Sequence, residues 1–179
     1  MVIKKRVVTT QKSRVLYKGK LFSLREEGIR LPSGKFFRRE TIFHPGSCAI
    51  IPLLSKKKII LIRQHRPSVR KTLWEIPAGT LERGEAPSSC ARRELIEEIG
   101  YHPKKLRKIT TFYTSPGFCT EKMHLYIASG LVRSSQNLEE DETIRPCSFS
   151  IAKVKKMIRR GTIQDSKTII GLSFLPNSL

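Results

Sequence analysis

Three glutamates on one short segment have the spacing of a metal site. Glu94, Glu97 and Glu98 occupy positions i, i+3 and i+4 of a predicted helix, which places them on one face. Like charges in this arrangement repel one another unless a cation lies between them. Carboxylates one helical turn apart are oxygen ligands of the kind that Mg²⁺ and Mn²⁺ prefer. The spacing therefore predicts a divalent metal site on this helix.

The residues just before the helix favour a tight loop against it. Gly79 permits a close turn of the backbone, which would bring a backbone oxygen such as that of Ala78 near the acidic cluster. Arg93 has Glu97 four residues on and can orient it. For Arg93 and Glu85 two interpretations stay open, an ion pair that supports the helix and a direct role at the metal.

The helix that carries this cluster is predicted over residues 86–99. Pro87 is tolerated in a first turn, and Gly100 stands where a helix C-cap needs glycine. Apolar residues recur every fourth position along it and give it one stripe to bury, formed by Ala91, Leu95 and Ile99.

Short apolar runs predict the strands that support the helix. They cover residues 48–54, 59–63, 73–78, 107–114, 124–128 and 147–150. Two further helices are predicted over residues 151–160 and 166–174. Mixed strands with helices indicate an α/β (α+β) fold, a sandwich in which helices cover a sheet.

The N-terminal part of the chain has a different pattern. Residues 14–44 alternate apolar and polar side chains across turn signals at 18–20 and 32–34, as antiparallel hairpins do. A sheet this small is marginal alone and needs a partner surface. We therefore expect a β-hairpin extension over residues 1–44 and a main domain over residues 45–179.

Length and composition restrict the class of protein. The 179 residues, 39% of them apolar, suit one compact globular domain with a core. No apolar run reaches the length of a membrane span, and the basic N-terminus does not resemble a secretory signal, so we expect a cytoplasmic protein. The four cysteines are far apart, which favours reduced, mostly buried thiols over a zinc site or a disulfide framework.

The chain is strongly basic. Its formal net charge of +20 predicts attraction to phosphorylated partners, including non-specific attraction to nucleic acid. The basic residues are spread along the sequence without the aromatic interleaving of a single-strand binding platform. A solvated basic surface is therefore the favoured interpretation over a dedicated nucleic-acid site.

The segment from Gly79 to Tyr101 resembles the signature of the Nudix hydrolases, with Tyr101 at a position that is usually aliphatic. The resemblance implies a Nudix-type α/β/α sandwich with a mixed sheet, preceded by a small antiparallel sheet. It implies a Mg²⁺ or Mn²⁺ cofactor and hydrolysis of a nucleoside diphosphate linked to another group. The metal ligands that it implies are Glu94, Glu97, Glu98 and the carbonyl of Ala78.

Further segments resemble the ADP-ribose pyrophosphatase branch of that family. Pro116 lies sixteen residues beyond Gly100, and residues 63–67, 74–79 and 165–172 are also similar to the branch. The resemblance implies hydrolysis of ADP-ribose to AMP and ribose 5-phosphate by a homodimer that exchanges N-terminal strands. Thr120 departs from the branch, which usually has Asp there, and this affects selectivity for the terminal ribose.

Substrate contacts follow from the same resemblance. It implies that the adenosine is held by Lys20, Leu21, Arg38 and Glu40, the diphosphate by Arg66, and the distal ribose by Gly117 and Glu121. For Arg38 a solvated surface role, and for Leu21 a place in an interface core, are the alternative interpretations. The catalytic base is expected in the acidic segment, at Glu142 or Glu140, with a solvated acidic loop as the alternative interpretation. Glu97 is expected to be catalytic as well as a metal ligand.

Two other functions remain open at this point. The same chemistry suits other nucleoside diphosphate sugars, such as ADP-glucose or GDP-mannose. The charge of +20 also suits an RNA-directed pyrophosphohydrolase or an RNA-binding protein.

Overall fold

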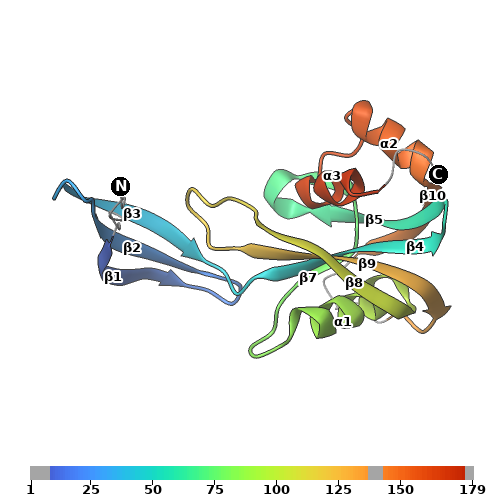
Figure 1. Ribbon diagram of the computed structural model, residues 1–179, viewed down its shortest axis with the longest axis horizontal. Coiled ribbons are helices and arrows are strands. Elements are labelled where there is room, and N and C mark those ends of the chain that lie inside the picture. The colour runs from blue at the N-terminus through green and yellow to red at the C-terminus, as the bar shows by residue number, and fades with distance from the viewer. Residues whose placement is uncertain (1–8, 137–142, 176–179) are drawn as a thin grey trace, which may run out of the picture. The chain divides into compact units, whose positions relative to one another are not determined.

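The computed structural model describes residues 9–136 and 143–175 (Figure 1). These residues form two compact units. Of the described residues, the first unit contains 9–46 and Phe112–Lys122, and the second contains Ser47–Thr111, 123–136 and 143–175. The loop around Pro116 thus belongs to the same unit as the N-terminal strands.

The first unit is a three-stranded antiparallel sheet. Its strands are β1 (Thr9–Lys18), β2 (Ser23–Arg30) and β3 (Phe36–Phe43), paired in that order. The loop after residue 113 joins β3 through two backbone hydrogen bonds, from Ile42 to the Phe118 carbonyl and from Thr120 to the Ile42 carbonyl. The predicted hairpins are confirmed.

The second unit is built on a mixed sheet. Its path runs β10-β5-β4-β9-β8, with β6 paired to β5 and β7 to β4. The parallel pair is β4 with β9, whereas β4 pairs antiparallel with β5. The strands are β4 (Ser47–Ser55), β5 (Lys58–Arg66), β6 (Lys71–Glu75), β7 (Ala78–Thr80), β8 (Tyr101–Tyr113), β9 (Lys122–Arg133) and β10 (Ile144–Ser150).

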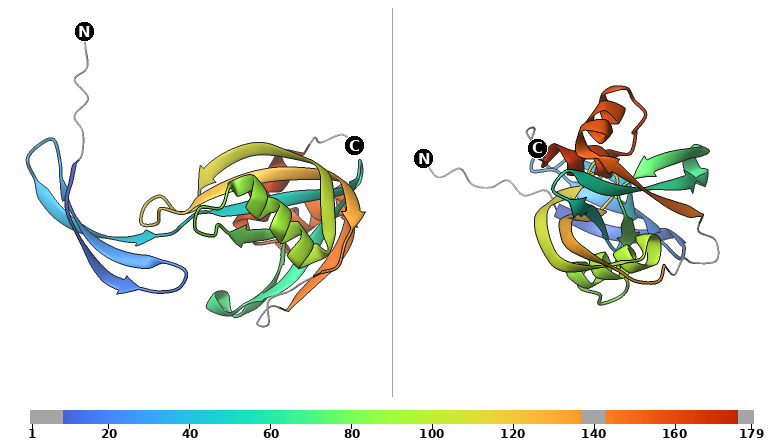
Figure 2. Two further views of the ribbon diagram at one scale, coloured as in Figure 1. Left: turned by 90° about the horizontal axis from the view of Figure 1, so that it is seen from below. Right: turned by 90° about the vertical axis from the view of Figure 1, so that its right-hand side faces the viewer.

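Helices cover both faces of this sheet (Figures 1 and 2). Residues on β4 alternate in direction: Ile50 packs in a cluster with Leu95 of α1 (Pro87–Ile99), and Ile51 lies against Gly171 of α3 (Ser166–Ser173). The other helix, α2 (Ile151–Arg159), follows β10, and a single 3-10 turn covers Pro67–Val69. The predicted α/β/α arrangement with a mixed sheet is confirmed.

Two strand predictions need correction. The strand expected over residues 73–78 is interrupted, because β6 ends at Glu75 and β7 begins at Ala78. Pro77 has no N–H to continue a ladder, and the Ile76 N–H donates instead to Thr168 Oγ1 at 2.8 Å. The edge strand β8 begins at Tyr101 rather than near residue 107, since its solvent-facing lysines hid the alternation and its edge position tolerates Pro103.

No helix in the described part of the chain is long and apolar enough to cross a membrane.

Candidate functional site

The acidic helix begins and ends as its sequence predicts. Pro87 occupies its first turn, and Gly100 adopts a left-handed conformation with φ of 69° and closes it with a hydrogen bond to the Ile96 carbonyl. The predicted apolar stripe is buried against the sheet, with Leu95 fully buried and Ile99 4% exposed. This packing turns the other face, with the glutamates, toward β7.

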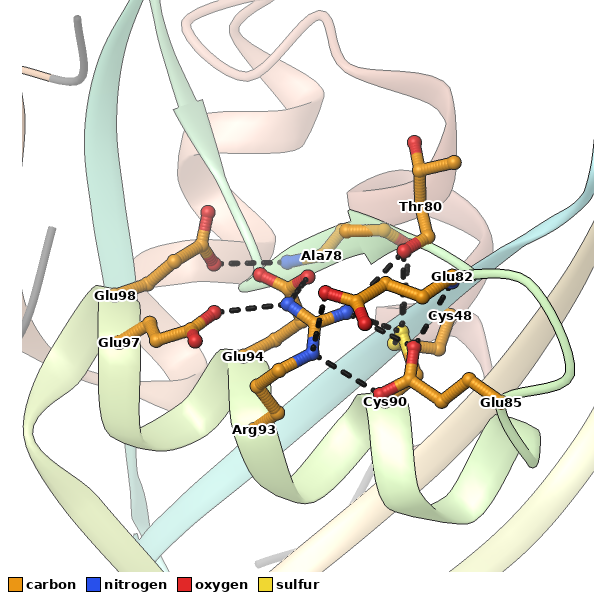
Figure 3. Close-up of polar contacts among 11 residues, drawn as sticks. Cys48, Ala78, Thr80, Glu82, Glu85, Cys90, Arg93, Glu94, Glu97 and Glu98 are labelled. Carbon is orange, nitrogen blue, oxygen red and sulfur yellow. Dashed lines mark hydrogen bonds and ion pairs between the residues drawn. The ribbon is translucent and has the colours of Figure 1, made fainter. Parts of the chain in front are cut away.

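Arg93 lies at the centre of the acidic cluster (Figure 3). Its Nε and Nη2 donate to the two oxygens of Glu85 at 3.0 Å each. Its Nη1 donates to Glu94 at 2.7 Å and to Glu97 at 2.9 Å. The ion pair between Arg93 and Glu85 is therefore present, and the same guanidinium also fixes two of the three clustered glutamates.

The charges of this cluster do not balance. The hydrogen bond with Glu85, the charge of Glu94 and the hydrogen bond with Glu97 raise the pKa of Arg93, so it stays protonated. The hydrogen bond from Arg93 lowers the pKa of Glu85 in turn. One positive charge faces three carboxylates, which leaves a net charge of −2 before Glu98 is counted. Such a group attracts a further cation.

Glu94 and Glu98 are held closely against the backbone of β7. Glu98 is 1% exposed, and its Oε2 accepts the Ala78 N–H at 2.9 Å. A Cβ on Gly79 would stand 1.7 Å from Oε1 of Glu94. Residue 79 must therefore be glycine for the Glu94 carboxylate to lie where it does.

The donor set of carboxylate and carbonyl oxygens is of the kind that Mg²⁺ and Mn²⁺ prefer. Among the described residues, no three His, Cys, Asp or Glu side chains are positioned to hold a metal. The Arg93 guanidinium stands among the carboxylates instead. A hard divalent cation fits this group, because the ligands are all oxygens and their negative charge exceeds that of Arg93. The absence of a side chain at Gly79 leaves room for the Glu94 carboxylate.

A second charged group lies at the end of β5. Arg66 donates through Nε and Nη2 to the two oxygens of Glu75, at 2.9 and 2.7 Å. Glu75 is 1% exposed and also accepts a hydrogen bond from Lys167. Two of five guanidinium N–H groups are used in this way, and the other three have no acceptor among the residues described here. Glu75 thus fixes the orientation of the Arg66 guanidinium and leaves its other edge available to an acceptor outside the described residues.

The network continues into α3. Lys167 Nζ also donates to Asp165 at 3.0 Å, and Asp165 caps α3 by accepting from the backbone N–H of Thr168. The Thr168 hydroxyl accepts the Ile76 N–H in the gap between β6 and β7. Sequence reasoning missed the contact between Glu75 and Lys167, because the two residues lie 92 positions apart and no local spacing relates them.

This network predicts acid-sensitive stability. Burial alone raises the pKa of Glu75, but hydrogen bonds and charges from Arg66 and Lys167 outweigh it and hold the pKa below its ordinary value of 4.5. The unfolded chain then binds the proton more readily, so the stabilisation is complete above about pH 4.5 and is lost as the pH falls through the folded pKa.

Replacing Glu75 by Gln tests this expectation. Breaking a buried pair costs about 3–5 kcal/mol, and the 36% exposure of Arg66 lowers this to about 2–3 kcal/mol at pH 7 through solvent screening. Urea unfolding at pH 7 and at pH 4 measures it. The variant should lose less stability than the natural chain on acidification, and an equal loss would contradict the role of Glu75.

The first unit holds the residues expected to contact adenosine. Arg38 and Glu40 lie on β3 with their side chains on one face, and Arg38 pairs with Glu26 at 3.5 Å. A pocket of about 440 Å³ on this face includes Arg38, Glu26 and Phe36. Lys20 and Leu21 lie in the turn between β1 and β2, both exposed.

The loop expected to contact the distal ribose also lies in the first unit. Glu121 accepts a hydrogen bond from the Thr114 hydroxyl at 2.8 Å and lies 3.9 Å from His44 Nδ1. Gly117 has open space around its Cα, with nothing within 4 Å of a Cβ built there. Glu140 and Glu142, the expected bases, lie outside the described residues.

Two contacts at α1 join residues that lie far apart in the sequence, so their pairing was not predicted. The Cys48 and Cys90 thiols lie 3.0 Å apart, and all four cysteines are free, two of them buried and two half-buried. The contact with Cys48, together with burial, raises the pKa of Cys90 and keeps it protonated. Gln136 donates to the Glu98 carbonyl at 2.7 Å and secures the C-terminal turn of the helix.

Comparisons with known proteins agree with this architecture. An ADP-ribose pyrophosphatase of Bacillus subtilis (strain 168) is 40% identical over 162 residues, 89% of this chain and 88% of its own. A methanol dehydrogenase activator of Bacillus methanolicus is 37% identical over 93% of this chain and 91% of its own. A GDP-mannose pyrophosphatase of Escherichia coli O139:H28 is 34% identical over 78% of each chain.

Structure comparison supports the fold. A crystal structure of an ADP compounds hydrolase superposes with a TM-score of 0.82 and 20% identity, covering 93% of this chain and 90% of that one. The NUDIX domain is matched over residues 43–169, which include the acidic helix, β7 and the Arg66 group. The motif prediction is confirmed, and the chain belongs to the Nudix hydrolase family.

Proposed function

We propose that this protein hydrolyses the diphosphate bond of ADP-ribose, giving AMP and ribose 5-phosphate, with Mg²⁺ or Mn²⁺ as cofactor. The observation that carries the proposal is the set of carboxylates on α1, gathered around Arg93 against Gly79. Two relatives named for this activity support the choice of substrate, at 40% and 33% identity.

The residues proposed for catalysis have separate roles in metal binding and in diphosphate binding. Glu94, Glu97 and Glu98, with the carbonyl of Ala78, would hold the metal, which when bound neutralises diphosphate oxygens and lowers the pKa of a coordinated water. Arg93 holds the carboxylates of Glu94 and Glu97 in position through hydrogen bonds from its Nη1. Arg66 offers its open guanidinium edge to the diphosphate. The hydrogen bond with Glu75 raises the pKa of Arg66, with a smaller contribution from the charge of Glu98, so the guanidinium keeps its positive charge.

The water needs a base, for which Glu142 or Glu140 is proposed, with Glu97 as the nearest alternative on α1. Lys20, Leu21, Arg38 and Glu40 are proposed for adenosine, and Gly117 and Glu121 for the distal ribose. Arg38 and Glu40 share one face of β3, as a joint contact requires.

A homodimer through the first unit is part of the proposal. A three-stranded sheet needs a buried hydrophobic face for its stability. It exposes large apolar side chains, with Val15 55%, Tyr17 56% and Leu21 51% exposed. An exposed apolar surface of this kind is typical of an interaction site.

The second candidate is a hydrolase of another nucleoside diphosphate sugar. The relative named GDP-mannose pyrophosphatase, at 34% identity, favours it. Thr120 also favours it, because the ADP-ribose pyrophosphatase branch usually has Asp at this position, next to Glu121 in the loop expected to contact the distal ribose.

A substrate panel decides between the two. We expect kcat/KM with Mg²⁺ or Mn²⁺ to be at least about tenfold higher for ADP-ribose than for ADP-glucose or GDP-mannose, because a pocket built for one sugar loses about 1.4 kcal/mol or more on another. Product analysis should show AMP and ribose 5-phosphate. An equal or higher value for a hexose conjugate would reassign the substrate.

A further inference from the structure

The helix α2 follows β10, which forms one edge of the main sheet (Figure 1). Cations and aromatic rings of these two elements and of the neighbouring strands β5 and β6 form a cluster. The cation–aromatic patch, as we name it, comprises Arg63 on β5, Trp74 on β6, Arg145 and Phe149 on β10, and Lys153 on α2. Strand pairing brings these residues together from three separate segments, so the sequence alone showed no aromatic interleaving among the basic residues.

The register places two like charges directly opposite each other. Arg145 of β10 pairs with Arg63 of β5, and both side chains are exposed. Like charges opposed across an antiparallel pair destabilise a sheet. Neither arginine forms an ion pair within the described residues. An anion bound between them would remove the repulsion.

Two aromatic rings adjoin these arginines. Trp74 and Phe149 make an edge-to-face contact with centroids 5.0 Å apart. The Arg63 guanidinium lies 5.7 Å from the Trp74 ring centre, and Lys153 Nζ lies 5.0 Å from that of Phe149. Indole and guanidinium planes are the surfaces on which unpaired bases stack.

The surroundings of the patch remain basic. The Ile151 N–H donates to the Lys57 carbonyl, so the lysine turn at residues 56–58 adjoins the start of α2. Exposed Lys156 and Arg159 continue along that helix, whose apolar residues Ile151 and Val154 are buried. No acidic residue occurs in residues 47–74 or 143–164.

We propose that the cation–aromatic patch binds single-stranded nucleic acid. Arg63, Arg145 and Lys153 hold successive phosphates, and a base stacks on the plane of Trp74. This function is separate from the diphosphate chemistry on α1. A membrane surface fits less well, because among the described residues the exposed large apolar side chains include none on β10 or α2.

Trp74 provides an internal probe, since it is the one tryptophan in the sequence. We expect a twelve-nucleotide oligouridylate to quench its emission, whereas polyphosphate, which lacks bases, leaves it unchanged. Three phosphates held by the patch predict that log K falls with log[salt] with a slope of about −2, from about 0.7 per phosphate on a single strand. Anisotropy of the labelled oligonucleotide measures this slope.

The variant Arg145→Glu/Lys153→Glu should weaken binding at least about tenfold at about 100 mM salt. Its matched control, Lys105→Glu/Lys108→Glu, makes the same charge change at exposed positions on β8, at the opposite edge of the sheet, and should stay within about threefold. Arg145→Ala/Lys153→Ala repeats the test without introduced charge, and circular dichroism checks folding of each variant.

Three results would overturn the proposal. Equal losses in the patch variant and its control would show that total charge alone attracts the oligonucleotide. Unchanged Trp74 emission at saturation would exclude stacking on the patch. Binding to phosphatidylserine vesicles with no measurable affinity for the oligonucleotide would make the surface a membrane contact.

Discussion

We expect the Glu98→Gln variant to lose at least about a thousandfold in kcat/KM while it remains folded. A catalytic metal supplies several kcal/mol of transition-state stabilisation, and each 1.4 kcal/mol is a factor of ten in rate. Glutamine keeps the carbonyl oxygen that accepts the Ala78 N–H, so the contact with β7 can persist while the negative charge is removed. Steady-state kinetics and Mn²⁺ titration of the same preparation measure both consequences.

Glu82→Gln is the matched control. The Glu82 side chain is 72% exposed and lies 3.9 Å from the Arg93 guanidinium, at the margin of the same cluster. Its kcat/KM should stay within about threefold of the natural chain, as expected for an exposed ion pair. Undiminished activity or Mn²⁺ affinity in Glu98→Gln would remove Glu98 from the metal site.

The Gly79→Ala substitution should be nearly as damaging although it removes no functional group. The added Cβ would stand 1.7 Å from Glu94 Oε1 and 2.0 Å from its carboxyl carbon, so the carboxylate must move away from β7. Overpacking of this kind costs about 1–3 kcal/mol, or roughly 2–12 °C in thermal midpoint for a chain of this size. We expect at least about a hundredfold loss in kcat/KM, because misplaced ligands lose much of their effect.

A second glycine separates this clash from the general effect of adding a methyl group. A Cβ on Gly117 would meet nothing within 4 Å, so Gly117→Ala should keep the thermal midpoint of the natural chain. The double variant Gly79→Ala/Glu94→Asp, with a shorter acid, should recover part of the lost midpoint. A Gly79→Ala protein with natural stability and activity would show that Glu94 does not need its place against β7.

Local spacing was sufficient to predict the acidic helix and its surroundings. Pro87 and Gly100 define its ends, and the i, i+4 relation between Arg93 and Glu97 appears as a 2.9 Å hydrogen bond. The apolar runs of β4 and β5 predicted central strands for the same reason, since their pattern is complete within a few residues.

Pairings between distant segments could not be predicted in this way. Glu75 meets Lys167, and Arg145 meets Arg63, only because strand order and register bring them together. The break between Glu75 and Ala78 depends on Thr168, which no window around Pro77 contains. In each case the partner residue comes from a distant segment that the fold brings close. Local sequence propensity therefore does not predict the contact.

The hydroxyl of Thr168 holds the backbone just before Ala78, and this matters during protein synthesis. A ribosome that has completed the acidic helix at Glu98 must add seventy more residues before Thr168 exists. At about 5–20 residues per second this takes roughly 4–14 s. Throughout that interval the nascent chain carries every carboxylate of the cluster without the anchor for the strand they face. Assembly of the site therefore awaits a segment that is translated about seventy residues after the acidic helix.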